Sequence, residues 1–398
     1  MLSLLITILG LEIAPVFGFD ASSKKNVAVY WGQASAGSQE SLASYCQSSD
    51  IDIILLSFLH SFPQKVGLDF TSSCTSSFPS GLLHCDQIGE DIKTCQNLGK
   101  KVLLSMGGSA GSYGLSDDTQ AQEFADTLWN TFAGGSTLER PFNDAIVDGF
   151  DFDIENQNSA GYVALAAKLR ELFSSSTKSY YLSAAPQCFF PDASVGDLLK
   201  SAYIDFAFIQ FYNNHCNVDR QFNWDTWAKF ASSTSNKNIK LYLGLPGSPS
   251  AAASGYISNM TKIQSTVDLI SRSGNFGGLM LWDASQSFSN QVDGNSYAAH
   301  MKEILNTIGT KALKDPESSK GPESSKGPES SKGPESSKGP ESSSVQSRTS
   351  TTLSRNTDAS ATQVSTSGGS LSTSVLTKII RLKTRAKSSV AVKVLKWF

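Results

Sequence analysis

The eight-residue segment DGFDFDIE, at positions 148–155, carries four acidic residues: Asp148, Asp151, Asp153 and Glu155. Bulky apolar residues occupy the positions between the last three. Carboxylates this close together repel each other and are costly to remove from water, so folding alone rarely selects such a pattern. The segment is therefore a candidate site for proton-transfer or ligand-binding chemistry.

Asp151, Asp153 and Glu155 share one face if the segment is a β-strand, because residues two apart point the same way. Their mutual repulsion raises the pKa of at least one carboxyl group, so that a proton stays available near neutral pH. A protonated Glu155 at the end of the strand suits a general acid. Asp148 is out of phase with the others, and a turn or cap role is at least as well supported for it as a catalytic one.

An acidic cluster can also bind a hard cation through its oxygens. A metal site would recruit ligands from other strands, whereas the other apolar runs of this chain end in Tyr, Gln, Trp and Gly. Aromatic faces and amides suit a sugar, because rings stack on its apolar faces and amides bind its hydroxyls. The sequence therefore predicts a carbohydrate site with no metal and no cofactor.

The elements that must position this site recur through residues 24–309. Apolar runs alternate there with helix-like stretches such as 119–132 and 161–173. Near-continuous hydrophobicity is typical of parallel strands that are covered on both faces, and eight such strands predict a (β/α)₈ TIM barrel in the α/β class. A doubly wound open sheet is the alternative, but no Gly-x-Gly-x-x-Gly follows the first run. The runs are 26–33, 51–60, 101–108, 149–155, 179–188, 204–213, 239–247 and 277–283.

Polar and special residues gather at the C-terminal ends of these runs. In a barrel those ends meet at the single face where active sites are built. Separate stretches of the chain therefore point to one site. Its candidate residues are Tyr30, Gln33, His60, Gly107, Gly108, Glu155, Gln187, Gln210, Tyr212, Trp282 and Asp283.

Together these residues resemble glycoside hydrolase family 18, the chitinases, and within it the hevamine-like group that includes secreted yeast and fungal endochitinases. The signature Asp-x-x-Asp-x-Asp-x-Glu is matched in full by residues 148–155, and SMGG at 105–108 is similar to the second signature. YWGQ at 30–33, QFYNN at 210–214, GLMLWD at 278–283 and the stretch 184–192 also resemble that group. The resemblance covers residues 24–309.

The resemblance implies a role for each site residue. Glu155 is the expected proton donor, and Asp153 supports the acetamido group of the substrate. Asp151 shares charge or a proton with Asp153 until Asp153 turns towards Glu155 on substrate binding. Tyr212 helps to hold the acetamido carbonyl. The expected substrate-binding residues are Tyr30, Phe58, Gly107, Gln210 and Trp282, although plain core packing is equally well supported for Phe58.

The activity that the resemblance implies is endo-hydrolysis of β-1,4-linked N-acetylglucosamine chains, by a retaining, substrate-assisted mechanism, in wall remodelling or cell separation. A catalytically inactive chitin-binding or inhibitor protein on the same barrel is the alternative, because function depends on the site rather than on the fold. Inactive members lack the catalytic Glu or the acetamido-binding aromatic residue, and Glu155 and Tyr212 are both present. The net charge of only −3 does not favour nucleic-acid binding, so we expect no nucleic-acid partner. We also expect a monomer.

Six cysteines without a Cys-x-x-Cys spacing favour disulfides in a secreted protein. Sequence arithmetic alone allows fifteen pairings. Asn259 lies in the only Asn-x-Ser/Thr sequon and is the expected glycosylation site. The family resemblance implies the pairs Cys46–Cys95, Cys74–Cys85 and Cys188–Cys216.

Composition divides the chain into five segments. Residues 1–18 form an apolar run that is typical of a signal peptide, with a buried N-terminal strand as the alternative. Residues 19–309 are the expected catalytic domain. Residues 310–344 hold PESSKG repeats whose prolines block helix and sheet, and 345–374 form a disordered Ser/Thr-rich segment. The basic tail, 375–398, could bind wall polysaccharide or membranes, or be a solvated tail without a role. We therefore expect a secreted, wall-associated protein.

Overall fold

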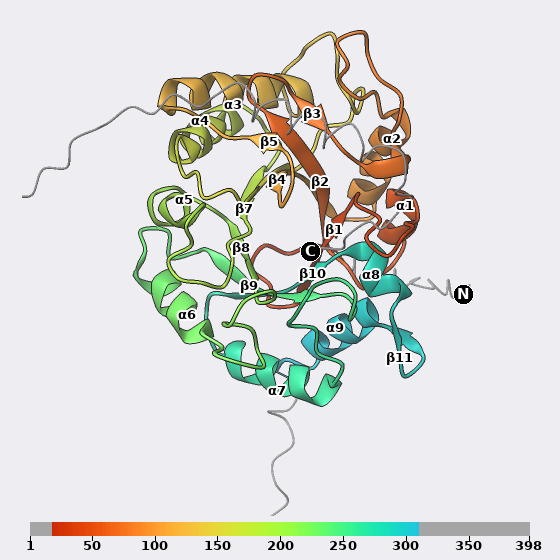
Figure 1. Ribbon diagram of the computed structural model, residues 1–398, viewed down its shortest axis with the longest axis vertical. Coiled ribbons are helices and arrows are strands. Elements are labelled where there is room, and N and C mark those ends of the chain that lie inside the picture. Colours follow the sequence, from red (N-terminus) through yellow and green to blue (C-terminus); the bar gives the residue numbers. More distant parts are fainter. Residues whose placement is uncertain (1–17, 310–398) are drawn as a thin grey trace, which may run out of the picture. The chain divides into compact units, whose positions relative to one another are not determined.

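The computed structural model describes residues 18–309, in which eight parallel strands close into a barrel because β1 pairs with both β2 and β10. Figure 1 shows this ring of strands with helices around its outside. The predicted TIM barrel is confirmed. Its strands are β1 (Asn26–Trp31), β2 (Ile53–Phe62), β4 (Lys101–Gly108), β6 (Gly149–Ile154), β7 (Tyr181–Ala184), β8 (Phe206–Gln210), β9 (Lys240–Pro246) and β10 (Phe276–Trp282).

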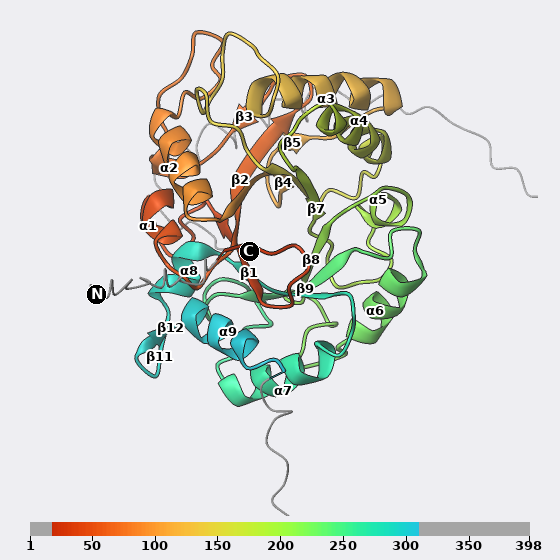
Figure 2. The same ribbon diagram turned by 180° about the vertical axis from the view of Figure 1, so that it is seen from behind.

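The helices of the described residues cover the outer face of the barrel (Figure 2). The stretches expected to be helical at 119–132 and 161–173 form α3 and α4. No helix within residues 18–309 is long and apolar enough to cross a membrane. The helices are α1 (Leu42–Cys46), α2 (Asp86–Asn97), α3 (Asp118–Phe132), α4 (Tyr162–Ser174), α5 (Gly196–Ser201), α6 (Trp224–Ser233), α7 (Met260–Ile270), α8 (Ala284–Ser289) and α9 (Tyr297–Asn306).

Short elements decorate this barrel. The strands β3 (Gly67–Leu68) and β5 (Ser112–Tyr113) both pair with β2, and a 3₁₀ turn, Thr71–Ser73, follows β3. The strands β11 (Gln291–Val292) and β12 (Asn295–Ser296) form a separate hairpin before α9. The linker, Ser/Thr-rich segment and basic tail expected at 310–398 lie outside the described residues, as does the expected signal peptide apart from Gly18.

The side chains of strand β6 alternate between the helical layer outside the barrel and the barrel interior. Phe150 and Phe152 point outwards, where their rings pack against Phe173 and Tyr162 of α4. Asp151 and Asp153 alternate with these phenylalanines and therefore face the barrel interior, where both are buried. Alternate residues of this one strand therefore face opposite sides: the phenylalanines pack under the helices, and the aspartates point into the barrel.

Buried aspartates hold the N-terminal end of the barrel. Asp148 Oδ2 accepts a hydrogen bond from the Val102 backbone N–H at 2.9 Å, and Lys178 Nζ lies 2.9 Å from its Oδ1. These partners lie at the N-terminal end of the barrel, so Asp148 has a structural position away from the candidate site, and its expected role as a turn or cap residue stays a prediction. Two other aspartates repeat the arrangement: Asp52 with Val27 N (2.8 Å) and Lys302 (2.6 Å), and Asp205 with Leu182 N (2.8 Å) and Arg170 (2.6 Å).

Three disulfides tie the loops to this framework, and they are the three pairs that the resemblance implied. The first joins α1 to α2, the second closes the loop before α2, and the third joins the segments that follow β7 and β8. Each stabilises the fold by about 2–4 kcal/mol through the loop that it closes. The pairs are Cys46–Cys95, Cys74–Cys85 and Cys188–Cys216, with Cα–Cα distances of 5.2, 5.4 and 5.8 Å.

Candidate active site

Asp151 lies deepest of the three carboxyl groups and is fully buried. The register of β6 with its neighbours sets Ser105 and Ser183 on either side of it. Both serine hydroxyls donate to Asp151, at 2.7 and 2.6 Å, and the Tyr30 hydroxyl donates to it at 3.0 Å. Burial raises the pKa of Asp151, and the three hydroxyl donors partly offset that effect.

Asp153 and Glu155 form a hydrogen-bonded pair of carboxyl groups. Burial raises the pKa of Asp153 well above its usual range, and the charges of Glu155 and Asp151 raise it further. Burial also raises the pKa of Glu155. Since both values are raised, the pair retains a proton at a pH where isolated carboxyls have lost theirs.

In the structure Asp153 pairs with Glu155, whose charge raises the pKa of Asp153 more than that of Asp151 does. Hydroxyl donors bind both oxygens of Asp151. The expected sharing of a proton between Asp153 and Asp151 before substrate binds stays a prediction. Gln210 also donates from Nε2 to Asp153 Oδ1 at 3.0 Å.

The backbone around Glu155 is held from two sides. The Glu155 N–H donates to the Tyr113 hydroxyl at 3.1 Å, and that hydroxyl donates to the Gly108 carbonyl oxygen at 2.6 Å. Two residues further on, the Gln157 N–H donates to Ser194 Oγ at 3.0 Å. Burial raises the pKa of Tyr113 to about 12, so its hydroxyl keeps its proton. Sequence reasoning missed Tyr113, because the two-residue strand β5 leaves no periodic signal.

Tyr212 follows β8 and joins the carboxyl groups at the barrel mouth. Its side chain is 6% exposed. Burial raises its pKa well above the ordinary value, and the charges of Asp153 and Glu155 raise it further, so the phenol remains a donor. The hydroxyl makes no hydrogen bond with another residue in the described part of the chain, which leaves it available to a ligand.

Three aromatic rings from different strands lie together beside the carboxyl groups. The Tyr30 ring centroid is 5.5 Å from that of Trp282 and 6.2 Å from that of Phe58. Phe58 stacks on Trp282, with centroids 5.9 Å apart and an interplanar angle of 20°. The structure therefore brings together the aromatic residues expected to line the site, while Phe58 also packs as a mostly buried side chain.

Gly107 lies against the backbone of β6. Its φ is +111°, and a Cβ atom there would lie 2.2 Å from the Asp153 carbonyl oxygen. Only glycine therefore lets β4 and β6 approach so closely. This contact gives Gly107 a structural role next to the site, and its expected contact with substrate stays a prediction.

Asp192 is a second residue that sequence reasoning missed. Its carboxylate accepts hydrogen bonds from the backbone N–H groups of Gln187, Ser194 and Val195, at 2.9, 2.8 and 2.7 Å. Its negative charge is also one cause of the raised pKa of Asp153 and Glu155. The available signal was an acidic residue directly after Phe-Pro, in the segment between β7 and α5, where it can close a turn on its own backbone.

The arrangement combines a carboxylic acid that keeps its proton, a second carboxyl beside it, an amide, a phenol and an aromatic floor. A proton donor next to a negative group can cleave an acetal, because the leaving oxygen needs a proton and the sugar develops positive charge. No group of three or more His, Cys, Asp or Glu in residues 18–309 could hold a metal ion. Fold and site together define a TIM-barrel protein with the acid–base equipment of a glycosidase.

Comparison with known proteins supplies the family. The model of glycosyl hydrolases family 18 matches residues 26–256, and the chain belongs to this family. It is 62% identical over 302 residues to the endochitinase of Saccharomyces cerevisiae, a match that covers 75% of this chain and 54% of that protein. It is 54% identical over 288 residues to chitinase 2 of Candida albicans, covering 72% and 49%. The chain thus spans about half the length of these curated relatives.

Solved structures show the same barrel with different functions. The ICChI chitinase from Ipomoea carnea is 33% identical with a TM-score of 0.62, over 70% of this chain and 99% of that one. The xylanase and α-amylase inhibitor protein XAIP-II from Scadoxus multiflorus is also 33% identical, with a TM-score of 0.58, over 71% and 97%. Similarity of fold alone therefore does not separate an enzyme from an inhibitor, and the site must decide.

Proposed function

We propose that this protein is an endochitinase that hydrolyses β-1,4-linked N-acetylglucosamine polymers. The observation that carries the proposal is the hydrogen-bonded pair of Asp153 and Glu155, both with a raised pKa, beside the open hydroxyl of Tyr212. The relatives named endochitinase and chitinase support the choice of substrate.

Hydrolysis follows a substrate-assisted route. Glu155 donates its proton to the glycosidic oxygen as the bond from that oxygen to the anomeric carbon breaks. The acetamido oxygen of the same sugar attacks the anomeric carbon and forms a cyclic oxazolinium ion. Asp153 accepts a hydrogen bond from the acetamido N–H and stabilises the positive charge, while Tyr212 donates to the acetamido oxygen.

Water completes the reaction. It attacks the anomeric carbon, breaks the bond to the acetamido oxygen and returns a proton to Glu155. Two inversions at one carbon give net retention, so the first product has the β configuration. Tyr30, Phe58 and Trp282 provide the floor on which the sugar at the cleavage point rests, because aromatic rings stack on the apolar face of a pyranose.

An inactive inhibitor or chitin-binding protein is the competing function, since such a protein shares this barrel. Loss of activity would be expected to remove the acid or the phenol of the site. Glu155 and Tyr212 are both present, and both stand next to Asp153, so the enzyme is the better supported function.

The test is hydrolysis of a fluorogenic chitooligosaccharide by the full chain. Glu155→Gln should lose roughly 10²–10⁴-fold in kcat, because that is what a positioned acid contributes, and should still bind substrate. Glu123→Gln, at an exposed position of α3, is the matched control. Absence of hydrolysis by the wild-type protein would leave the inhibitor function. An α-configured first product, seen by NMR before mutarotation, would refute the mechanism but not the substrate.

We also propose that the protein is secreted as a monomer and acts on the cell wall, in remodelling or cell separation. Three disulfides support an oxidising compartment. Asn259 is exposed, and its Oδ1 caps α7 by accepting from the Lys262 N–H at 3.0 Å, which leaves its amide nitrogen free for a glycan. Endoglycosidase treatment that shifts the mass of the wild type but not of Asn259→Gln would support this modification.

A further inference from the structure

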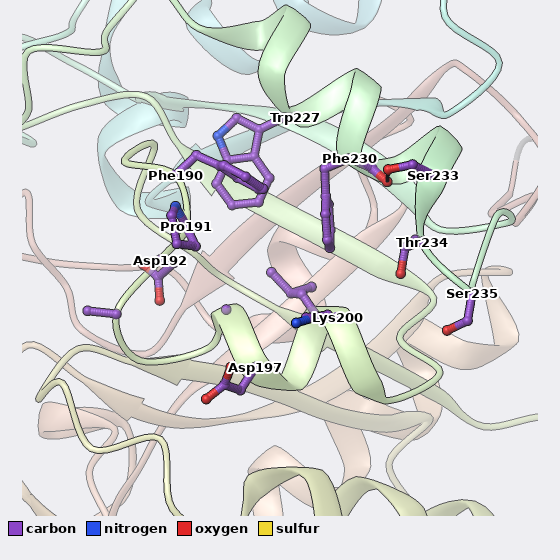
Figure 3. Close-up of a pocket in the computed structure, with 13 residues that line it drawn as sticks. Phe190, Pro191, Asp192, Asp197, Lys200, Trp227, Phe230, Ser233, Thr234 and Ser235 are labelled. Carbon is purple, nitrogen blue, oxygen red and sulfur yellow. Dashed lines mark hydrogen bonds between the residues drawn. The ribbon is translucent and has the colours of Figure 1, made fainter. Parts of the chain in front are cut away.

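A groove of about 610 Å³ lies on the outside of the barrel, between α5 and α6. Figure 3 shows the rings of Phe190, Trp227 and Phe230 gathered along one wall, with Lys200 facing them. The Phe190 centroid is 5.1 Å from that of Trp227 and 5.4 Å from that of Phe230. Helix α5 has only six residues and leaves part of this wall uncovered: Phe190 is 40% exposed and Phe230 is half-buried, whereas Trp227 is buried beneath them.

The groove also carries polar groups without partners. Thr234 is 8% exposed, and its buried Oγ1 has no hydrogen-bond partner. Buried hydroxyls in folded proteins nearly always have a partner, so this hydroxyl is available to a group bound in the groove. Asp197 and Lys200, both exposed, form no ion pair with any other residue in the described range 18–309. Figure 3 places Thr234 beyond Phe230, at the end of the groove away from Phe190.

We propose that this groove is a second carbohydrate-binding site, which takes a short stretch of β-1,4-linked N-acetylglucosamine. The inference rests on the proposed substrate. The volume falls within the range of about 300–1,000 Å³ that is usual for small-ligand sites. The exposed ring of Phe190 and the half-buried ring of Phe230 match the apolar faces of sugar rings, while an ammonium, a carboxylate and a hydroxyl match hydroxyl and acetamido groups.

One loop of the protein connects the groove to the active site. Phe190 lines it, and Asp192, two residues on, ties the same loop to Gln187. Gln210, which orients Asp153, donates to the Ala185 carbonyl oxygen at the start of this loop. A segment of the polysaccharide bound in the groove therefore contacts the loop of the protein that leads to the carboxyl groups. Its expected role is to keep the protein on insoluble chitin near a bond that it can cut.

Two tryptophans make the two sites separately observable. Trp227 lines the groove, whereas Trp282 stacks on Phe58 in the active site. The full chain carrying Glu155→Gln is labelled with 5-fluorotryptophan and titrated with chitotetraose, and Trp→Phe variants assign the ¹⁹F resonances. Both resonances should shift, each with its own dissociation constant. A shift at Trp282 alone overturns the second site, while a shift at neither, with no hydrolysis by wild type, contradicts the proposed function itself.

Thr234→Val is the sharpest variant, because it keeps the shape of the side chain and removes a hydroxyl that bonds to nothing in the protein. The fold should not lose stability. The dissociation constant reported by Trp227 should rise roughly tenfold, as for one lost hydrogen bond, while that reported by Trp282 stays the same.

Lys200→Ala should have the same effect, with Lys229→Ala on the exposed face of α6 as the matched control. Retention on insoluble chitin should fall with Thr234→Val and Lys200→Ala, but turnover of a soluble substrate should not. If the Trp227 titration is unchanged in both variants, the assignment of this groove is wrong.

Discussion

Gln210 holds Asp153 in place: its Nε2 lies 3.0 Å from Asp153 Oδ1 and 3.0 Å from the Ala185 carbonyl oxygen. Both acceptors bind the same amide nitrogen, so the orientation of the side chain is fixed. Asp153 is thereby kept on the side where it pairs with Glu155. We infer that this amide affects the proposed reaction through the position of that carboxyl.

Gln210→Leu should therefore lower kcat more than it changes KM. A hydrogen bond to a charged group is worth about 1.5–3 kcal/mol, which corresponds to a loss of roughly 10- to 150-fold. Steady-state kinetics on a chitooligosaccharide measure the effect. Gln122→Leu, at an exposed position of α3, is the control. An unchanged kcat in Gln210→Leu would show that Asp153 does not depend on this amide.

Substitution of the two aspartates should separate their roles. Asp153→Asn removes the negative group that faces Glu155, and the loss of kcat should be severe. Asp151→Asn should be milder, because Asp151 is bound to Ser105, Ser183 and Tyr30 rather than to the reacting pair. Comparison of kcat for the two variants checks this order. Equal losses, or the reverse order, would show that Asp151 takes a direct part in proton transfer.

Activity should fall as pH rises through the raised pKa of Glu155. The acid must be protonated to act, and burial raises its pKa above the usual value, so the decline should begin above the range of an ordinary glutamate. Asp153 and Glu155 hold a proton between them, and Asp151→Asn removes a charge that raises the pKa of Asp153, so the basic limb that this pair sets should move to lower pH. The profile of kcat/KM against pH measures both. If the basic limb does not move, the charge of Asp151 does not affect the proton held by Asp153 and Glu155.

The same groups make stability depend on pH. Asp153 and Glu155 have folded-state pKa values above their unfolded values, so they favour the folded state below the unfolded pKa. That contribution is lost as pH rises through the folded pKa, at about 1.4 kcal/mol per unit of pKa difference. Glu155→Gln should therefore raise Tm at pH 8 more than at pH 4. Calorimetry at the two pH values decides it, and an equal change at both would contradict the raised pKa.

Patterns within single segments were readable from the sequence. The eight apolar runs became the eight strands, and the alternation of β6 correctly placed Phe150 outside and Asp151 inside. Contacts between segments were not readable. Tyr113 reaches Glu155 from a two-residue strand, and side chains from three other strands donate hydrogen bonds to Asp151. Such contacts depend on which side chains the closed barrel brings together.

Asp192 shows how such a contact can be tested. Asp192→Ala removes the acceptor of three backbone N–H groups, so it should lower Tm and loosen the loop that carries Phe190 and Ala185. Asp192→Asn keeps one acceptor oxygen and removes the charge.

Because that charge raises the pKa of Asp153 and Glu155, the basic limb of kcat/KM in Asp192→Asn should move to lower pH, even where Tm is nearly kept. Asp225→Asn, at an exposed position of α6, is the control for a change of net charge. If Asp192→Asn lowers Tm but leaves the pH profile in place, Asp192 only holds the loop. A moved profile makes it a positioning residue that also sets the proton affinity of the catalytic pair.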